Sequence, residues 1–310
     1  MSAPDLSIII VSFNTRQLLA DCLRSVHDVR DEAAIEVFVV DNHSADGSAD
    51  MVEQDFPWVQ LIRNPSNAGF AAANNLALAR ATGRYVMLLN SDTIVHDGAF
   101  RTLVRFMDDR PSAGYCGPKL LNEDGTHQPS ARRFPTPLSR AYAMTGMSER
   151  KPASAHCQDL HVRLGADTPF RAGWFTGACL VVRRETYREV GPLDDGYFLY
   201  YEETDWCRQM AQAGWQGWYV PGAVVTHLGG RSVEHTSQVR PFFGNHPVHW
   251  VNSSRRYFRR WYGVGGLVFT ELLQLLLYAA IWLRHVWRRS EQSRIKARTA
   301  GSALRYMITA

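Results

Sequence analysis

Four short apolar runs, each ending in polar residues, constrain the fold of the first third of this chain most strongly. They lie in LSIIIVSFN, IEVFVVDNHSADGS, VQLIRN and RYVMLLNSD. The segments between them have helical apolar spacing, most clearly at Leu18, Leu19, Cys22, Leu23 and Val26. This alternation of strands and helices predicts an α/β fold with a parallel sheet and helices on both faces.

The polar ends of these runs indicate where a ligand would bind. Ligands of such sheets bind outside the carboxyl ends of the strands. Asn14, Asp41, residues 64–67 and residues 90–92 follow the four predicted strands. Because these strand ends meet at one edge of the sheet, we expect Asp92 to face a site rather than the core.

Size and cysteine content fit a globular protein of a reducing compartment. The chain has 310 residues, 45% of them hydrophobic, which predicts a sizeable core. Its five cysteines are scattered and include no Cys-x-x-Cys pair, so they indicate reduced thiols rather than a structural zinc site. No signal-peptide pattern precedes the first apolar run.

Several polar segments have both a structural and a chemical interpretation. Asp92 could hold a divalent cation beside a diphosphate, or it could cap the next helix. The loop after Asp41 could bind a nucleobase or ribose, or form Asx turns. Asn67 and Gly69 could let a phosphate approach a helix N-terminus. The chain lacks both Gly-x-Gly-x-x-Gly and the P-loop pattern, which argues against a standard dinucleotide fold and a P-loop.

Two segments of the second half offer candidates for acid–base or metal chemistry. YYEETDW places Glu202, Glu203 and Asp205 within one helical turn. This cluster could complement the helix dipole, or crowding could raise one pKa and produce a general base. His227 ends an apolar strand and could be a structural residue or a metal ligand.

Together these stretches resemble the inverting nucleotide-sugar glycosyltransferases of family 2, and within that family the bacterial rhamnosyltransferase-type members. The resemblance implies the Rossmann-like GT-A fold, whose sheet is mixed and mainly parallel with helices on both faces. The stretches that carry the resemblance are SIIIVSFNTRQLLADCLRSV, VFVVDNHSADGS, NPSNAGFAAANN, VMLLNSDT, GWFTGACLVVRRETYREVGPLDDGYFLYYEETDWCRQ and VVTHLGGRS. They cover most of residues 6–232, and their shared order and spacing make the likeness specific.

The resemblance implies a donor site and a metal site. Ser12, Asn14 and Asp41 would hold the base and ribose. The further residues implied at the donor site are Asn67, Gly69, Asn74, Asn90, Ser91 and Asp92. Asn90-Ser91-Asp92 corresponds to the family's Asp-x-Asp motif, with Asn in the first position. Asp92 and His227 would therefore hold Mg²⁺ or Mn²⁺.

The resemblance also implies a catalytic base and an acceptor site. EETD matches a Glu-Asp-x-Asp stretch whose second residue is the usual base, and Glu203 occupies that position here. Because Glu is one methylene longer than Asp, Glu203 and Asp205 both stay candidates, with Glu202 beside them. The implied acceptor-binding residues are Trp174, Asp194 and Asp195.

The reaction implied is a metal-dependent inverting transfer of a sugar from a dTDP- or UDP-linked donor. The best match is L-rhamnose from dTDP-rhamnose, transferred to a hydroxyl of a glycan or lipid-linked acceptor in cell-surface polysaccharide synthesis. The departures at Asn90 and Glu203 leave an alternative, a catalytically inactive sugar-nucleotide- or glycan-binding module. Residues 229–245, rich in Gly, Ser and polar residues, are expected to close over the donor.

We expect a GT-A catalytic domain over residues 1–250, with a donor half at 1–115 and an acceptor half at 116–250, followed by a basic helical region at 251–310. Residues 144–170 are expected to form a long loop. From residue 255 onward the chain has eleven Lys/Arg and two acids, whereas the net charge of the whole chain is +4. The body is therefore mildly acidic, and the tail suits an anionic partner.

Residues 267–283 predict an apolar helix with Thr270, Glu271, Gln274 and Tyr278 on one face. An amphipathic helix at an anionic membrane surface fits this pattern, while docking on protein and spanning the bilayer stay open. The tail has no nucleic-acid-binding module, so no nucleic-acid partner is expected. We therefore expect a cytoplasmic protein, peripheral at the inner face of the membrane.

Overall fold

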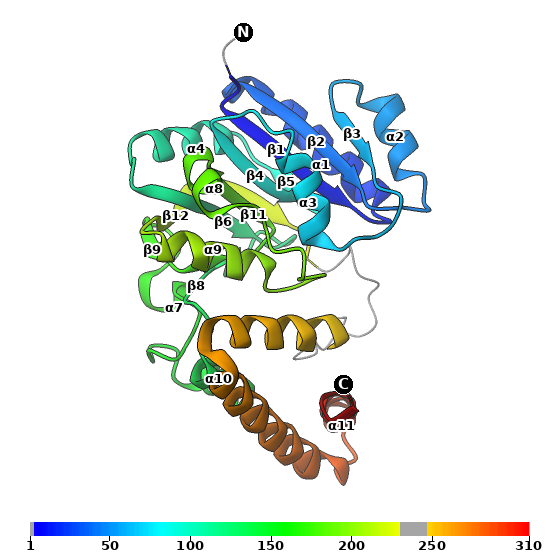
Figure 1. The fold of residues 1–310 in the computed structure, drawn as a ribbon, viewed down its shortest axis with the longest axis vertical. Coiled ribbons are helices and arrows are strands. Elements are labelled where there is room, and N and C mark those ends of the chain that lie inside the picture. The colour runs from blue at the N-terminus through cyan, green and yellow to red at the C-terminus, as the bar shows by residue number, and fades with distance from the viewer. Residues whose placement is uncertain (1–2, 230–246, 310) are drawn as a thin grey trace. The chain divides into compact units, whose positions relative to one another are not determined.

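The computed structural model describes residues 3–229 and 247–309 and divides into two compact units (Figure 1). The described part of the first unit comprises residues 3–134, 159–198 and 202–229. That of the second comprises residues 135–158, 199–201 and 247–309. The domain limits at residues 115 and 250 stay predictions.

The first unit contains a large twisted sheet. Its main strands are β1 Leu6–Ser12, β2 Ile35–Asp41, β3 Gln60–Arg63, β4 Tyr85–Asn90, β5 Thr93–Val95, β6 Ala113–Leu121, β11 Cys179–Arg183 and β12 Gln216–His227. They lie in the order β3, β2, β1, β4, β11, β6, β12, β5. The pairs β1–β2, β1–β4, β2–β3 and β6–β12 are parallel, whereas β11 and β5 pair antiparallel with their neighbours.

Short strands and helices complete this unit. The strands are β7 His127–Gln128, β8 Ala131–Arg132, β9 Phe170–Ala172 and β10 Trp174–Phe175, of which β8 and β10 form a separate pair. The helices are α1 Arg16–Asp28, α2 Ser48–Asp55, α3 Phe70–Leu78, α4 Ala99–Asp108, α7 His161–Leu164, α8 Arg184–Val190 and α9 Glu202–Gln212, with a 3-10 turn at Arg30–Glu32.

Each face of the sheet has its own hydrophobic core. Because side chains alternate along a strand, Ile8 and Ile10 of β1 pack with residues of α1, α2 and α4. Ile9 points to the other face, where it joins residues of α3 and α9. The predicted mixed, mainly parallel sheet with helices on both faces is confirmed.

The carboxyl ends of four strands meet at one edge of this sheet, as the sequence predicts. Ser12, Asp41, Asn90 and His227 end β1, β2, β4 and β12. β12 runs parallel to β6, and both β6 and β4 are antiparallel to β11, so all four strands point the same way. Candidate residues far apart in the chain therefore gather at this edge.

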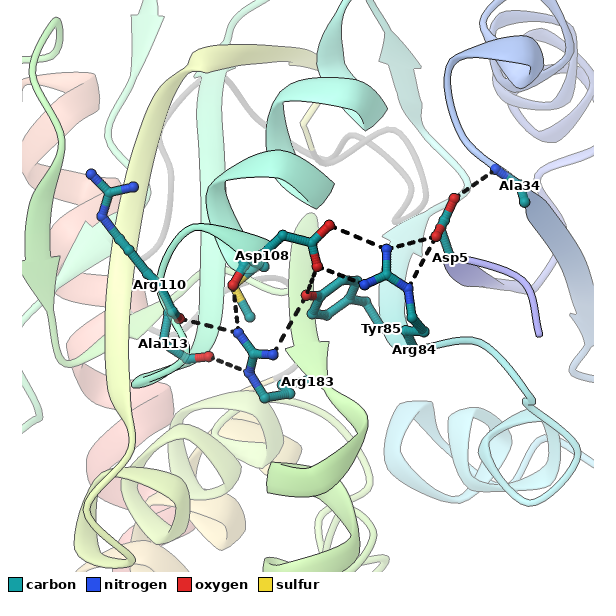
Figure 2. A network of polar contacts seen from close by, with 9 residues as sticks. Asp5, Ala34, Arg84, Tyr85, Asp108, Arg110, Ala113 and Arg183 are labelled. Carbon is teal, nitrogen blue, oxygen red and sulfur yellow. Dashed lines mark hydrogen bonds and ion pairs between the residues drawn. The ribbon is translucent and has the colours of Figure 1, made fainter. Parts of the chain in front are cut away.

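The opposite end of β4 is fixed by a polar network (Figure 2). The Arg84 guanidinium contacts Asp5 at 2.7 Å and Asp108 at 2.6 Å, and the Tyr85 hydroxyl donates to Asp108. Arg183 of β11 donates to backbone carbonyls at the end of α4 and just beyond it. Because the network sits at the start of β4, it anchors the sheet without occupying the edge that carries the site.

α3 ends at Leu78, and Gly83 passes so close to β1 that an added Cβ would lie 2.7 Å from the Ser7 nitrogen. One local prediction differs from the structure. Residues 144–170, expected as a loop, contain the short helices α6 Met147–Arg150 and α7.

The second unit is helical. It contains α5 Pro137–Met144, α6, α10 Pro247–Val286 and α11 Glu291–Thr309. Gly263 has φ +65° and breaks α10 into two helices, the second of which contains the predicted helix 267–283. The predicted closing loop lies outside the described residues except for Gly229.

Candidate active site

Asp92 and His227 meet at the carboxyl edge of the sheet. Nε2 of His227 lies 3.4 Å from Oδ1 of Asp92, whose side chain is 2% exposed. β12 pairs with β5 through His227 and Thr93, and the Leu228 N–H donates to the Asp92 carbonyl at 2.9 Å. Backbone pairing therefore brings together two residues that are 135 positions apart in the sequence.

Gln128 fixes the imidazole of His227. Its Oε1 lies 2.7 Å from Nδ1 of His227, while its Nε2 donates to Asn122 and to the His227 carbonyl. Because the amide nitrogen is engaged with acceptors, Oε1 must accept a hydrogen bond from Nδ1–H. In a neutral imidazole the lone pair then lies on Nε2, the nitrogen nearest the Asp92 carboxylate.

A divalent cation fits this arrangement. A carboxylate oxygen and an imidazole lone pair are both electron-pair donors, so a cation between them stabilises their proximity. No third His, Cys, Asp or Glu joins them among the residues that the structure describes. The residues present therefore suit a Mg²⁺ or Mn²⁺ that takes its other ligands from substrate phosphates and water.

A chain of buried hydroxyls joins the end of β1 to the metal-site loop. Ser12 Oγ lies 2.9 Å from Thr15 Oγ1, which donates to Ser91 Oγ at 3.0 Å. All three residues are less than 5% exposed. Thr15 thus links the predicted donor residues Ser12 and Ser91, and their hydroxyls serve as structural links here.

The loops after β1 and β2 interlock. Asn14 accepts from the Ala45 N–H at 2.7 Å through Oδ1, and its own N–H donates to the Ser44 hydroxyl. Asp41 is 5% exposed; its Oδ2 accepts from the Ser44 N–H, while its buried Oδ1 has no hydrogen-bond partner. A ligand hydroxyl or N–H at this edge would satisfy that oxygen.

Asn42 organises the loop that leads into α3. Its Nδ2 donates to Asn67 Oδ1 at 2.8 Å, and its Oδ1 accepts from Asn64 and from the Ala68 N–H. Gly69 has φ +84°, and an added Cβ would lie 2.4 Å from the Phe198 carbonyl oxygen. Glycine is required there because both the backbone conformation and the space exclude a side chain.

Asn74 and Asn90 occupy different environments. Asn74 is 1% exposed in α3 and donates to the Phe70 carbonyl at 2.8 Å, with its buried Oδ1 lacking a hydrogen-bond partner. Asn90 is half-buried at the end of β4, where its N–H donates to the Ala178 carbonyl. Asn90 therefore lies at the site edge, and Asn74 lies beneath it.

Glu203 lies in the first turn of α9, in a setting that suits a base. Burial raises the pKa of Glu203 from 4.5 to about 7. Hydrogen bonds from backbone N–H groups, including that of Gly177, partly oppose this rise because they stabilise the carboxylate. Burial also raises the pKa of Glu202 well above its ordinary value, and the neighbouring Glu203 carboxylate adds to this effect. Neither Glu202 Oε2 nor Glu203 Oε2 has a hydrogen-bond partner.

Gly177 and Ala178 lie between Glu203 and the end of β4. The Gly177 N–H donates to Glu203, and the Ala178 carbonyl accepts from the N–H of Asn90, two residues before Asp92. Asp205 is fully buried and accepts from Gln209 Nε2 at 2.8 Å, within α9 itself. The choice of base between Glu203 and Asp205 stays a prediction.

The expected acceptor residues lie on nearby segments of the same unit. Trp174 on β10 is half-buried and donates its indole N–H to the Arg133 carbonyl at 2.9 Å. Asp194 accepts from the Gly196 N–H at 3.0 Å, and Asp195 is exposed. Their role in acceptor binding stays a prediction.

Backbone strain gathers in the loops that carry these residues. Four described residues other than glycine have positive φ: Asn14, His43, Tyr200 and Tyr201. Each such residue costs about 1–3 kcal/mol and persists where the surroundings enforce it, often at functional sites. Two follow β1 and β2 directly, and the other two precede Glu202.

Comparison with known proteins decides the family. The model of the glycosyl transferase family 2 domain matches residues 7–174, which is more than half of the chain. The chain belongs to glycosyltransferase family 2. This family 2 enzyme is a glycosyltransferase, and its relatives include rhamnosyltransferases. It is 30% identical over 237 residues to the N-acetylglucosaminyl-diphospho-decaprenol L-rhamnosyltransferase of Mycobacterium tuberculosis, covering 72% of this chain and 75% of the relative.

Two further comparisons agree. The family 2 enzyme is 25% identical over 227 residues to the dTDP-rhamnosyl transferase RfbF of Shigella flexneri, covering 72% of this chain and 67% of the relative. Its fold resembles that of a mannosyltransferase from Pyrobaculum calidifontis solved with GDP-mannose and Mn²⁺, with a TM-score of 0.53, 16% identity, and coverage of 99% of this chain and 86% of the other. The predicted GT-A fold is thereby confirmed.

Sequence analysis of this family 2 enzyme missed three residues that shape the site: Thr15, Gln128 and Gly177. Thr15 and Gly177 contact predicted site residues directly. Asn42 belongs to the polar loop after Asp41 that the sequence offers as a nucleobase or ribose site, and it contacts Asn67. Gln128 has no local signal, since it reaches His227 only through the pairing of β7 with β6 and of β6 with β12.

Proposed function

We propose that this family 2 enzyme transfers L-rhamnose from dTDP-rhamnose, with inversion and with the help of a divalent cation, to a hydroxyl of a glycan or lipid-linked acceptor of the cell surface. The proposal draws on the names of the two rhamnosyltransferase relatives, one of which takes a dTDP-linked donor and the other a diphospho-decaprenol acceptor. The observation that carries it is the Asp92–His227 pair, with its imidazole fixed by Gln128, on the sheet edge that also carries Glu203.

Asp92 and His227 would hold the cation. When bound, Mg²⁺ or Mn²⁺ supplies positive charge against the diphosphate that departs, so the leaving group needs no proton. Gln128 keeps the imidazole oriented for this task. Asp41, Asn67 and Gly69 lie on the loops beside this pair and would hold the nucleotide.

Glu203 would act as the base. Its carboxylate takes the proton from the acceptor hydroxyl as the oxygen attacks the anomeric carbon. The bond from that carbon to the diphosphate oxygen breaks on the opposite face, and the diphosphate leaves with the electron pair. One displacement through an oxocarbenium-like transition state therefore inverts the configuration. A pKa near 7 suits this role because a base works best when its pKa lies near the operating pH.

The test measures release of nucleoside diphosphate from dTDP-rhamnose and from UDP- and GDP-linked sugars, with Mg²⁺, Mn²⁺ or EDTA and a polyprenyl-diphosphate-linked acceptor. We expect release from dTDP-rhamnose that EDTA abolishes. Asp92→Ala should abolish it as well, whereas Asp97→Ala, an exposed aspartate five residues away, should not. Donor binding without release would favour a binding module. Release from another donor alone would refute the choice of rhamnose.

We further propose that the enzyme works at the cytoplasmic face of a membrane. One described helix, Val248–Val286, is long and apolar enough to cross a bilayer by length and composition. A lipid-linked acceptor would place the reaction at such a surface.

A further inference from the structure

The second half of α10, residues 264–286, has a reversed polarity. Thr270, Gln274 and Tyr278 are 1%, 2% and 1% exposed and face the interior of the second unit. The outward side chains are apolar and form a continuous stripe, which we call the leucine face: Val264, Val268, Phe269, Leu272, Leu276 and Leu283. A soluble protein places these two kinds of residue the other way round.

The buried polar face is held by contacts within the second unit. Arg255 donates to Glu271 Oε2 at 3.0 and 2.9 Å and to the Met307 carbonyl of α11 at 3.0 Å. This pairing neutralises the acid in the middle of the apolar helix. The polar side of this helix is therefore already packed within the second unit, and the leucine face is the side that stays exposed.

α11 packs against α10. His285 Nδ1 lies 3.1 Å from Ser293 Oγ, and the Met307 carbonyl accepts from Arg255, which lies before the break at Gly263. The small or apolar side chains of Ala297, Ala300 and Ala303 are buried. The opposite side of α11 and the residues before it are basic; the exposed cations are Arg284, Arg288, Arg289, Arg294, Lys296, Arg298 and Arg305, against one acid, Glu291.

We propose that the leucine face docks on an anionic lipid bilayer, with α10 lying in the plane of the membrane and the exposed Arg284, Arg288 and Arg289, at the end of this face, at the lipid headgroups. This inference deepens the proposed function by naming the surface that would meet a lipid-linked acceptor. An aliphatic stripe that ends in three exposed arginines, with Trp287 87% exposed among them, has the chemistry of an interfacial helix. Each cation near an anionic surface adds attraction.

The structure argues against the two other occupants of this face. A helix that crosses the bilayer would carry α11 and its exposed cations into hydrocarbon, at a high cost in free energy. A second copy of the chain on this face would add a second set of the same arginines, and no acid lies among the leucine-face residues to pair with them. Only 17% of the apolar window of this helix is buried, so it is not a core helix of its own unit.

The experiment is flotation of the full chain with vesicles of phosphatidylcholine containing 30% phosphatidylglycerol, compared with phosphatidylcholine alone. We expect flotation that requires the anionic lipid and weakens in 0.5 M salt. Leu276→Glu should weaken partition about tenfold or more, because a leucine side chain leaves the membrane and a charge enters it. The matched control is Leu164→Glu on α7, where the leucine is 42% exposed and partition should stay within about twofold.

Labels give a readout that does not depend on the effect of a charge on folding. All five native cysteines are buried, so a cysteine at Leu276 or Leu164 can be labelled selectively with an environment-sensitive dye. The dye at residue 276 should shift to the blue with anionic vesicles, and the dye at residue 164 should not. Depth quenching should place labels at residues 264, 276 and 287 at similar shallow depths.

Three results would overturn the inference. The first is that Leu276→Glu floats as well as wild type. The second is that depth quenching places a label at residue 276 at the centre of the bilayer. The third is that the protein forms a dimer without vesicles and that Leu276→Glu converts this dimer to a monomer. Flotation needs neither donor nor turnover. A failure here therefore leaves the proposed reaction intact, and an inactive enzyme leaves this inference intact.

Discussion

The ionisation of Glu203 should control both the rate and the stability of this enzyme. As a base, Glu203 acts only as the carboxylate, and burial raises its pKa to about 7. We expect kcat/KM to rise about tenfold per pH unit below pH 7 and to level off above it. Glu203→Gln should lower kcat by about 10²–10⁴-fold, because glutamine cannot take the proton.

The same pKa predicts a change in stability with a definite sign. The pKa is 4.5 in the unfolded reference and about 7 when folded, so the folded state binds the extra proton between these values. Wild type therefore loses stability as pH rises from 4.5 to 7, by at most about 3 kcal/mol at 1.36 kcal/mol per pKa unit. Glu203→Gln does not ionise and escapes this loss. Its free energy of unfolding should exceed that of wild type at pH 8 but not at pH 4.5.

The assays are a pH–rate profile from pH 5.5 to 8.5 and urea unfolding at pH 4.5 and 8. Glu185→Gln is the matched control, since Glu185 is also an acid in the first turn of a helix but is exposed. That variant should leave both measurements unchanged. A flat pH–rate profile, or a Glu203→Gln variant with a tenth of wild-type kcat, would refute the reasoning.

Three further predictions concern the site and its support. Asp92→Asn should lower metal-dependent turnover about 10³-fold, as steady-state rates at saturating Mn²⁺ would report; retained Mn²⁺ dependence would contradict this. Gln128→Leu should raise the Mn²⁺ concentration for half-maximal activity about 10–100-fold with kcat largely kept, and Gln128→Glu should restore it in the same titration. Gly69→Ala should lower the free energy of unfolding, measured in urea, by about 3 kcal/mol. The control Gly98→Ala should lower it by only about 1 kcal/mol, because Gly98 has a similar φ of +81° but nothing within 4 Å of an added Cβ.

The sequence by itself determined the class of fold and the edge at which the site lies. Short apolar runs bounded by polar residues, such as residues 85–89, favour buried strands, and parallel strands bring their polar ends together. Asp92 and His227 were therefore predictable as neighbours of the same edge. Family-specific order and spacing then indicated the reaction, because separate motifs with one shared arrangement are rarely coincidental.

Only the tertiary structure decided which polar residues act on one another. Gln128 contacts His227 across two strand pairings. Asp205 accepts from Gln209 within α9, whereas Glu203 accepts from the Gly177 N–H. None of these contacts follows from a local sequence pattern. The inward face of Thr270, Gln274 and Tyr278 was equally undecided, because the periodicity of a helix shows that two faces differ but not which one is covered. Contacts between residues distant in sequence settle such questions, since their free energies depend on packing that no single segment contains.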